Sequence, residues 1–212
     1  MKGVIFDLDG TLIDSATTIL KSLREACVCS GIKADDNLFL TTLIGPPVEQ
    51  TVKKLFPDID DEKCQEITKA FRSIYNNCGH KDTVLYTGID QMLKNLKAQG
   101  KKIFLCTNKP IIPTNILLTN LKIKEFFDKV LTRDFLLNIK LSKMEMIRIV
   151  LKEQEADCIM VGDCISDIQA AHENGIKGIA VDWGYEKDKK GLMKISDYMA
   201  QTVQELQENL ND

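Results

Sequence analysis

Two acidic residues at the end of the first apolar segment have the types and spacing that chemistry requires. Asp7 and Asp9 follow the apolar run Val4-Ile5-Phe6, and Gly10 permits a tight turn directly after them. In an extended backbone alternate side chains point the same way, so we expect both carboxylates to face one crevice. Carboxylates held this close repel each other unless something compensates their charge. The pair therefore indicates a bound cation, or a division into one ionised and one protonated carboxyl group.

A calcium-binding loop does not explain this pair. Such a loop has acids at its first, third and fifth positions and glycine at the sixth, whereas Leu12 stands at the sixth position counted from Asp7. A polar turn leaving a strand is the ordinary structural explanation of an Asp-x-Asp-Gly tetrapeptide. Further polar residues near Asp7 and Asp9 are therefore needed to identify a functional site.

Polar side chains also follow two later apolar segments. Thr107 and Asn108 come after residues 102–106, and a hydroxyl and an amide can donate hydrogen bonds to phosphate oxygens. Asp163 and Asp167 come after residues 158–161, and carboxylate oxygens are the ligands that hard divalent cations prefer. Each of these residue types also caps loops and helices, so none of them alone defines a site.

A lysine at the start of a predicted helix is the remaining candidate. Lys143 follows Ser142, which we expect to cap that helix. The helix dipole disfavours a cation at this end unless the cation meets an anion. Lys143 is therefore either a partner for the acidic residues or a solvated surface lysine.

Alternating strands and helices are expected to position these residues. Short apolar segments rich in β-branched residues predict buried parallel strands, and helix-period segments lie between them. This alternation favours right-handed βαβ units, so we expect an α/β protein whose ligands bind at the carboxyl ends of its strands. The expected strands are 2–7, 102–106, 129–131, 158–161 and 178–181, and the expected helices are 90–99, 114–121, 142–153 and 166–174.

One stretch departs from this alternation. Between residues 15 and 83 only helical patterns occur, and Gly45-Pro46-Pro47 predicts a rigid turn among them. We therefore expect a helical insertion, 15–83, in a discontinuous core formed by 1–14 and 84–212. The helices expected in the insertion are 15–30, 37–43, 48–56 and 60–77.

The composition excludes several classes of protein. The 212 residues carry 28 Lys and Arg against 31 Asp and Glu, a net charge of -3, which gives no reason to expect a nucleic-acid partner. A hydrophobic content of 44% excludes a disordered chain. The seven cysteines show no Cys-x-x-Cys spacing, and no segment has the pattern of a signal peptide or a membrane span. We expect a cytoplasmic monomer or homodimer without a membrane partner.

The candidate residues occur in an order that resembles the four motifs of the haloacid dehalogenase-like hydrolase superfamily. FDLDGTLIDS is similar to the first motif, CTN to the second, Lys143 to the third and VGDCISD to the fourth, so the resemblance spans essentially the whole chain. Tyr86-Thr87-Gly88 and residues 174–185 are similar to the phosphoglycolate phosphatase-like branch. The resemblance implies a Rossmann-like parallel sheet core with an inserted α-helical cap domain. Lys143 lacks the proline that follows this lysine in relatives, which leaves Lys140 as its competitor.

The resemblance also implies a mechanism. Asp7 would attack phosphorus and form an aspartyl-phosphate that water hydrolyses, while Asp9 would act first as general acid and then as general base. Thr107 and Asn108 would orient the phosphoryl group, and Mg²⁺ would neutralise the site together with Lys143. The metal ligands that the resemblance implies are Asp7, Asp163, Asp167 and the backbone carbonyl of Asp9.

The activity expected from the resemblance is hydrolysis of a small phosphorylated metabolite, a phosphate monoester, as in phosphoglycolate phosphatases. The cap would close over the crevice and recognise the leaving group. Gly45 lies in a tripeptide that resembles the family's cap substrate loop, although a simple rigid turn explains it equally well. Arg24 and Arg72 are candidate cations for an acidic leaving group, and each is as easily a solvated residue of a helix.

Other activities stay open at this stage. A phosphosugar mutase, a pyrophosphatase and a 5′-nucleotidase share the expected core. A phospho-accepting signalling module is the alternative from another class, and Asp9 and the large insertion argue against it. A dehalogenase is disfavoured because halide displacement needs no metal-binding acids.

Overall fold

The computed structural model describes residues 2–33, 35–77, 80–154 and 157–211. The chain divides into two compact units, one formed by Met1–Asp14 with Val84–Asp212 and the other by Ser15–Thr83. We call them the core unit and the helical unit. The core unit contains an antiparallel pair of short strands, β2 (Ile13–Asp14) and β3 (Val84–Leu85), at the two points where the chain leaves and re-enters it.

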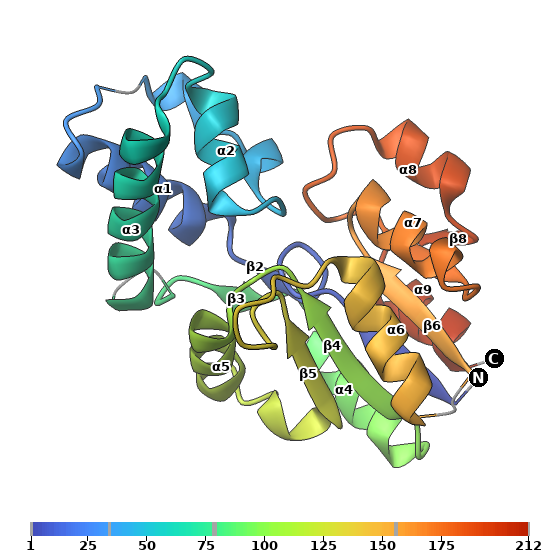
Figure 1. The fold of residues 1–212 in the computed structure, drawn as a ribbon. Coiled ribbons are helices and arrows are strands. Elements are labelled where there is room, and N and C mark those ends of the chain that lie inside the picture. The colour runs from blue at the N-terminus through green and yellow to red at the C-terminus, as the bar shows by residue number, and fades with distance from the viewer. Residues whose placement is uncertain (1, 34, 78–79, 155–156, 212) are drawn as a thin grey trace. The chain divides into compact units, whose positions relative to one another are not determined.

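A six-stranded parallel sheet forms the centre of the core unit (Figure 1). Its strand order is β5-β4-β1-β6-β7-β8. Strand β1 therefore lies between β4 and β6, where the order of the strands along the chain reverses. Parallel sheets bind ligands beyond the carboxyl ends of their strands at such a switch in order. The strands are β1 (Gly3–Phe6), β4 (Lys102–Thr107), β5 (Lys129–Thr132), β6 (Cys158–Gly162), β7 (Gly178–Val181) and β8 (Tyr198–Ala200).

Helices cover both faces of this sheet. Successive side chains of a strand point to opposite faces, so each buried strand contributes apolar side chains to both helical layers. In β1, Val4 and Phe6 pack on one face against α4 (Ile89–Ala98), α5 (Ile111–Asn120) and α9 (Val203–Asn211). Ile5 packs on the other face. The helices of that face are α6 (Lys143–Gln154), α7 (Ile165–Glu173) and α8 (Lys189–Ile195), and the short 3-10 helix η3 (Lys124–Phe126) precedes β5.

The helical unit has its own apolar core. It consists of α1 (Ala16–Cys29), η1 (Asp36–Leu38), η2 (Thr41–Leu43), α2 (Val48–Leu55) and α3 (Asp61–Asn77). The side chains that fill this core come from its three α-helices and include Leu23, Cys27, Val52, Ile67 and Phe71.

The structure confirms the predicted α/β class with a parallel sheet and a helical insertion. The helix expected at 37–43 is wrong, since this stretch forms only η1 and η2. Leu38 and Leu40 are 42% and 55% exposed, whereas Leu43 is buried, so the apolar residues of this stretch do not share one buried face that would stabilise an α-helix. The edge strand β8 and the helices α8 and α9 were not predicted.

None of the helices built from the described residues has the length and apolar character needed to span a membrane.

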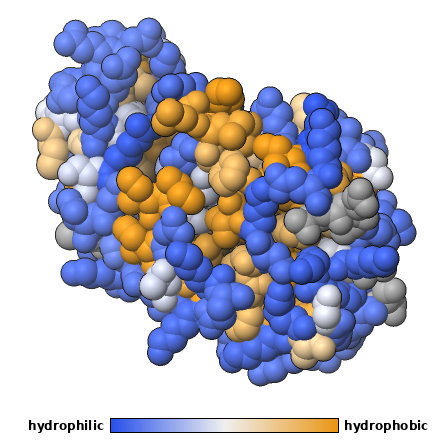
Figure 2. All heavy atoms as spheres, turned by 60° about the horizontal axis from the view of Figure 1, so that its bottom comes forward, coloured by the Kyte–Doolittle hydropathy of each residue, from blue (hydrophilic) through white to orange (hydrophobic). Residues whose placement is uncertain are grey.

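Apolar side chains remain exposed in parts of the core unit. Figure 2 shows apolar side chains interrupting a largely polar surface on the face that it presents. In the segment between β5 and α6, Leu136 and Ile139 form an isolated β-bridge, and Leu137 between them is 89% exposed.

Candidate active site

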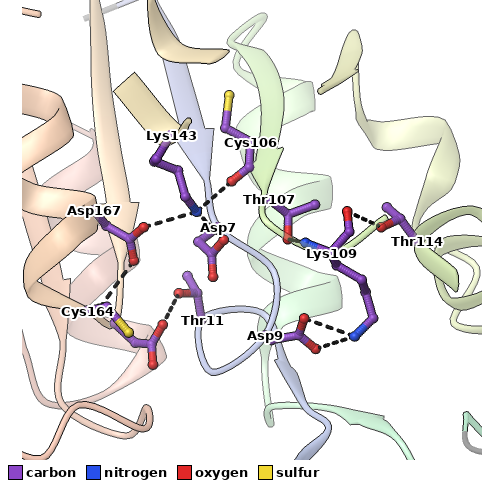
Figure 3. Close-up of polar contacts among 11 residues, drawn as sticks. Asp7, Asp9, Thr11, Cys106, Thr107, Lys109, Thr114, Lys143, Cys164 and Asp167 are labelled. Atoms are coloured by element: carbon purple, nitrogen blue, oxygen red, sulfur yellow. Dashed lines mark hydrogen bonds and ion pairs between the residues drawn. The ribbon is translucent and has the colours of Figure 1, made fainter. Parts of the chain in front are cut away.

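The core unit brings together polar side chains from the ends of neighbouring strands (Figure 3). Asp7 follows β1, Asp163 follows β6, and Asp167 lies in the first turn of α7. Lys143 forms an ion pair with Asp7, and its Nζ lies 3.0 Å from Asp167 Oδ1. The same ammonium donates a hydrogen bond to the carbonyl oxygen of Cys106 at 2.8 Å. One lysine thus joins the ends of β1, β4 and β6.

The local sequence explains why Lys143 occupies this position. Ser142 and Glu145 form a capping box, in which Glu145 N donates to Ser142 Oγ and Ser142 N donates to Glu145 Oε2 at 2.8 Å. Helix α6 therefore begins at Lys143. Its side chain is only 7% exposed, whereas Lys140 is exposed at the surface. The two competing lysines thus differ in placement, and Lys143 lies among the acidic residues.

Asp163 is held from two sides. Thr11 Oγ1 donates a hydrogen bond to Asp163 Oδ1 at 3.3 Å, and Tyr185 N donates to Asp163 Oδ2 at 2.7 Å. Gly184 makes the second contact possible, because a Cβ built on this residue would lie 2.1 Å from Asp163 Cβ. The segment after β7 thus supports an acidic residue that follows β6.

Asp9 corrects one expectation from the sequence. β1 ends at Phe6, and the carbonyl of Leu8 accepts hydrogen bonds from the backbone N–H groups of residues 11, 12 and 13. The backbone therefore turns, and the alternation of an extended strand does not extend to Asp9. Its carboxylate binds Lys109 Nζ at 2.9 and 3.0 Å and points away from that of Asp7 (Figure 3).

Lys109 is a residue that the sequence interpretation missed. It directly follows Thr107 and Asn108, so its position beyond the end of β4 was the available signal. Thr107 Oγ1 accepts a hydrogen bond from Lys109 N at 3.1 Å. Asn108 is half-buried in the same segment.

Burial dominates the electrostatics of the acidic residues. It raises the pKa of Asp7 to about 8, since the nearby Lys143 offsets only part of the desolvation and the carboxylates of Asp167 and Asp163 add to it. Burial and the carboxylate of Asp167 raise the pKa of Asp163 to about 7. Burial alone would lower the pKa of Lys143, but Asp167 and Asp7 raise it above its usual value. The site therefore holds more buried carboxyl groups than its one central ammonium can keep ionised.

This excess of carboxylates fits a divalent cation. Ligand atoms of Asp163, Cys164 and Asp167 lie within 4.8 Å of one another. Burial and the adjacent carboxylates raise the pKa of the Cys164 thiol above its usual range, so the thiol stays protonated. Carboxylate oxygens are the ligands preferred by a hard ion such as Mg²⁺. Asp163 and Asp167 are therefore the members of this cluster whose side chains suit the ion, and ligation by Asp7 remains a prediction.

The remaining predicted residues belong to the helical unit. Gly45 lies between η2 and α2 with a φ of 107°, a conformation that favours glycine. Arg72 forms an ion pair with Glu49 at 2.7 Å, and Arg24 is exposed. The assignment of Gly45 to substrate recognition remains a prediction.

Together the fold and the site define a parallel α/β enzyme with carboxylates and a lysine at its switch point. A family model, the haloacid dehalogenase-like hydrolases, matches residues 4–181. The chain belongs to this family of hydrolases, which confirms the resemblance seen in its four motifs.

Individual relatives carry different activities. The chain is 33% identical to the pyrophosphatase PpaX of Bacillus velezensis, over 96% of this chain and 93% of that protein. It is 29% identical to a phosphoglycolate phosphatase of Cereibacter sphaeroides, over 87% of each. It is also similar to the solved structure of the protein tyrosine kinase PtkA of Mycobacterium tuberculosis, with 28% identity, a TM-score of 0.84, and coverage of 100% of this chain and 98% of that one.

Proposed function

We propose that this protein is a Mg²⁺-dependent phosphatase that hydrolyses a small phosphate monoester through an aspartyl-phosphate intermediate. The observation that carries the proposal is the ion pair between Asp7 and Lys143 beside the buried carboxylates of Asp163 and Asp167. It brings the proposed nucleophile, a cation and the proposed metal-binding oxygens together near the ends of β1 and β6. The similarity to two phosphatases supports the same chemistry.

Asp7 is the proposed nucleophile. One of its carboxylate oxygens forms a bond to phosphorus, and the bond between phosphorus and the leaving oxygen breaks. Asp9, which must carry a proton for this step, gives that proton to the leaving oxygen and becomes a carboxylate. A water molecule then attacks the phosphorus of the aspartyl-phosphate and gives a proton back to Asp9, which releases phosphate and regenerates Asp7.

Lys143 and the residues at the end of β4 are proposed to hold the phosphoryl group. Lys143 is fixed by Asp7, Asp167 and the carbonyl of Cys106, so its charge needs no reorganisation when a phosphate binds. Thr107 and Asn108 are proposed to orient the phosphoryl oxygens. Such groups contribute most when they are positioned before the reaction.

Mg²⁺ is the proposed cofactor. When bound, it supplies positive charge that reduces repulsion between an anionic nucleophile and an anionic phosphate. Asp7 and Asp163 are proposed to ligate it together with the backbone carbonyl of Asp9, and Asp167 to ligate or orient it. The thiol of Cys164 is not proposed as a ligand.

The helical unit, residues 15–83, is proposed to act as a cap that recognises the leaving group, with Gly45 in its substrate loop. The printed names of the relatives suggest 2-phosphoglycolate, pyrophosphate and nucleotides as candidate substrates.

Phosphate release from a panel of phosphorylated compounds tests the proposal. The panel contains 2-phosphoglycolate, pyrophosphate, nucleotides, sugar phosphates and p-nitrophenyl phosphate, each with and without Mg²⁺. Asp7→Asn is the blank, because it keeps the shape of the side chain and removes the nucleophile. Mg²⁺-dependent release that the blank lacks supports the proposal, while equal release by Asp7→Asn contradicts it. A parallel assay with ATP and a tyrosine peptide tests for the activity named for the solved relative.

A further inference from the structure

Asp9 and Lys109 form a nearly buried ion pair within the core unit. Both oxygens of Asp9 accept hydrogen bonds from Lys109 Nζ, at 2.9 and 3.0 Å. The side chains are only 12% and 6% exposed, so neither is a solvated surface charge. A buried ion pair of this kind persists only when its geometry is well supported.

The backbone of Lys109 is fixed on both sides. Its N–H donates to Thr107 Oγ1 at 3.1 Å, and its carbonyl accepts a hydrogen bond from Thr114 Oγ1 at 3.4 Å. Both threonines are buried, one at the end of β4 and the other in α5. The Lys109 ammonium therefore contacts Asp9 from a backbone segment that Thr107 and Thr114 hold in place.

The two aspartates of the first motif each have their own lysine. Lys143 pairs with Asp7, and Lys109 pairs with Asp9. Like charges two residues apart would otherwise compete for one cation. Figure 3 shows the two carboxylates pointing in different directions, each toward its partner.

We propose that Lys109 is a positioning residue for Asp9, which holds the Asp9 carboxylate away from Asp7 and Lys143 until a leaving group is bound. The inference rests on the proposed function, because it concerns the group that protonates the leaving oxygen. Without Lys109, the Asp9 carboxylate turns toward Lys143 and competes with Asp7 for its charge. Nothing in this role requires Lys109 to touch the substrate.

The first test uses the leaving group as a readout. A phenolate leaves without a proton, whereas an alkoxide needs one, so only alkyl esters depend strongly on Asp9. Lys109→Met removes the charge and keeps the length of the side chain. We expect it to lower the ratio of kcat/KM for the best alkyl ester to kcat/KM for p-nitrophenyl phosphate by about tenfold or more, within the range that general acid catalysis contributes. Lys109→Arg keeps a cation that can bind both oxygens and is expected to restore most of the ratio.

A double mutant separates positioning from a direct role. In an Asp9→Asn background there is no carboxylate to place, so Lys109→Met is expected to change alkyl-ester hydrolysis by less than about twofold. Lys124→Met, at an exposed lysine of the core unit, is the matched control and is expected to leave the ratio unchanged. An equal loss with both esters, a rise in the ratio, or an undiminished loss in the Asp9→Asn background would overturn the proposal.

A crystal structure of Lys109→Met tests the same proposal without relying on activity. We expect the Asp9 carboxylate to leave the orientation that it has in the wild type. An unchanged orientation would overturn the inference even in an active phosphatase. Failure of the wild type to release phosphate from any compound of the panel would instead contradict the proposed function, while the orientation of Asp9 would still decide whether Lys109 positions it.

Discussion

Tyr185 donates its main-chain N–H to Asp163 Oδ2 over 2.7 Å, and thereby fixes an acidic residue that lies 22 positions earlier in the chain. The phenol of the same tyrosine donates to Asp14 Oδ1 at 3.0 Å. The segment after β7 thus holds both a proposed metal ligand and the end of β2. The contact with Asp163 uses the backbone of Tyr185. It therefore depends more on the small size of the neighbouring Gly184 than on the tyrosine ring.

Gly184→Ala is expected to weaken metal binding. The added Cβ would lie 2.1 Å from Asp163 Cβ, so the carboxylate must move. Disturbing the support of a metal ligand typically reduces affinity by 10- to 100-fold, so we expect the Mg²⁺ concentration for half-maximal activity to rise by about tenfold or more. Tyr185→Phe, which keeps the main-chain N–H, is the control and is expected to leave the Mg²⁺ requirement unchanged. Equal Mg²⁺ requirements for Gly184→Ala and the wild type would contradict this account of Asp163.

Stabilisation by Mg²⁺ is expected to depend on pH. In the metal-free protein the pKa values of Asp7 and Asp163 are raised from 3.8 to about 8 and about 7, so the folded protein binds protons more tightly than the unfolded chain. The contribution of these carboxyls is therefore fully present below about pH 4 and is lost as the pH rises toward about 8. A bound cation favours the ionised carboxylates. We expect Mg²⁺ to raise Tm more at pH 8 than at pH 5, relative to protein treated with a chelator, and equal rises at the two pH values would count against this site.

Asp128→Asn is expected to destabilise the core unit. Asp128 is 19% exposed, pairs with Lys97 at 2.8 Å and accepts a hydrogen bond from Ile103 N at 2.8 Å. Burial opposes ionisation, but the hydrogen bonds from Lys97, Ile103 and Lys102 lower the pKa of Asp128 below its usual value. Its contribution is therefore present above about pH 4 and is lost as the pH falls through the lowered pKa.

Urea unfolding at pH 7 measures this contribution. We expect Asp128→Asn to lower the free energy of unfolding by about 1 kcal/mol. Asp90→Asn is the matched control, since Asp90 is an exposed partner of Lys94 at 3.4 Å and exposed pairs contribute less than about 0.5 kcal/mol. An equal decrease in the free energy of unfolding in both variants would show that the buried contacts of Asp128 contribute no extra stability.

Alkylation is expected to distinguish two cysteines. Cys106 is fully buried, and burial raises the pKa of its thiol to about 12. Cys29 is exposed. Iodoacetamide at pH 8 is therefore expected to modify Cys29 and to spare Cys106 in the folded protein, since the thiolate is the reactive form. Mass spectrometry of the digested protein reads out both sites, and modification of Cys106 before unfolding would refute the prediction.

Local patterns were sufficient to predict five of the six strands of the sheet and the start of α6. Apolar runs such as Val4-Ile5-Phe6 are buried on both faces of a parallel sheet, so their composition alone indicates the strand. Ser142 and Glu145 are three residues apart, and this spacing defines the cap that places Lys143. β8 was missed because its three residues, Tyr198–Ala200, are too few to show a period.

The pairing of Asp9 with Lys109 was beyond local patterns. The two residues are 100 positions apart, and their contact depends on the adjacency of β1 and β4. The turn at Leu8 also redirects Asp9, whereas an extended chain would have aligned it with Asp7. Sequence spacing therefore predicted the members of the first motif, while the direction of each carboxylate followed from tertiary structure.

The pairing of β2 with β3 has a consequence for the history and engineering of this chain. Residues 13 and 14 lie opposite residues 85 and 84, and within the helical unit Thr18 Oγ1 and Thr83 Oγ1 are 2.9 Å apart. The segment that leaves the core unit and the segment that returns to it therefore lie side by side. Such a unit can be removed, lengthened or exchanged by two neighbouring splices, one at each junction, because no strand of the central sheet needs to change its register. Under the proposed function, exchange of the helical unit would change which leaving group is recognised, while the proposed reacting groups of the core unit would stay in place.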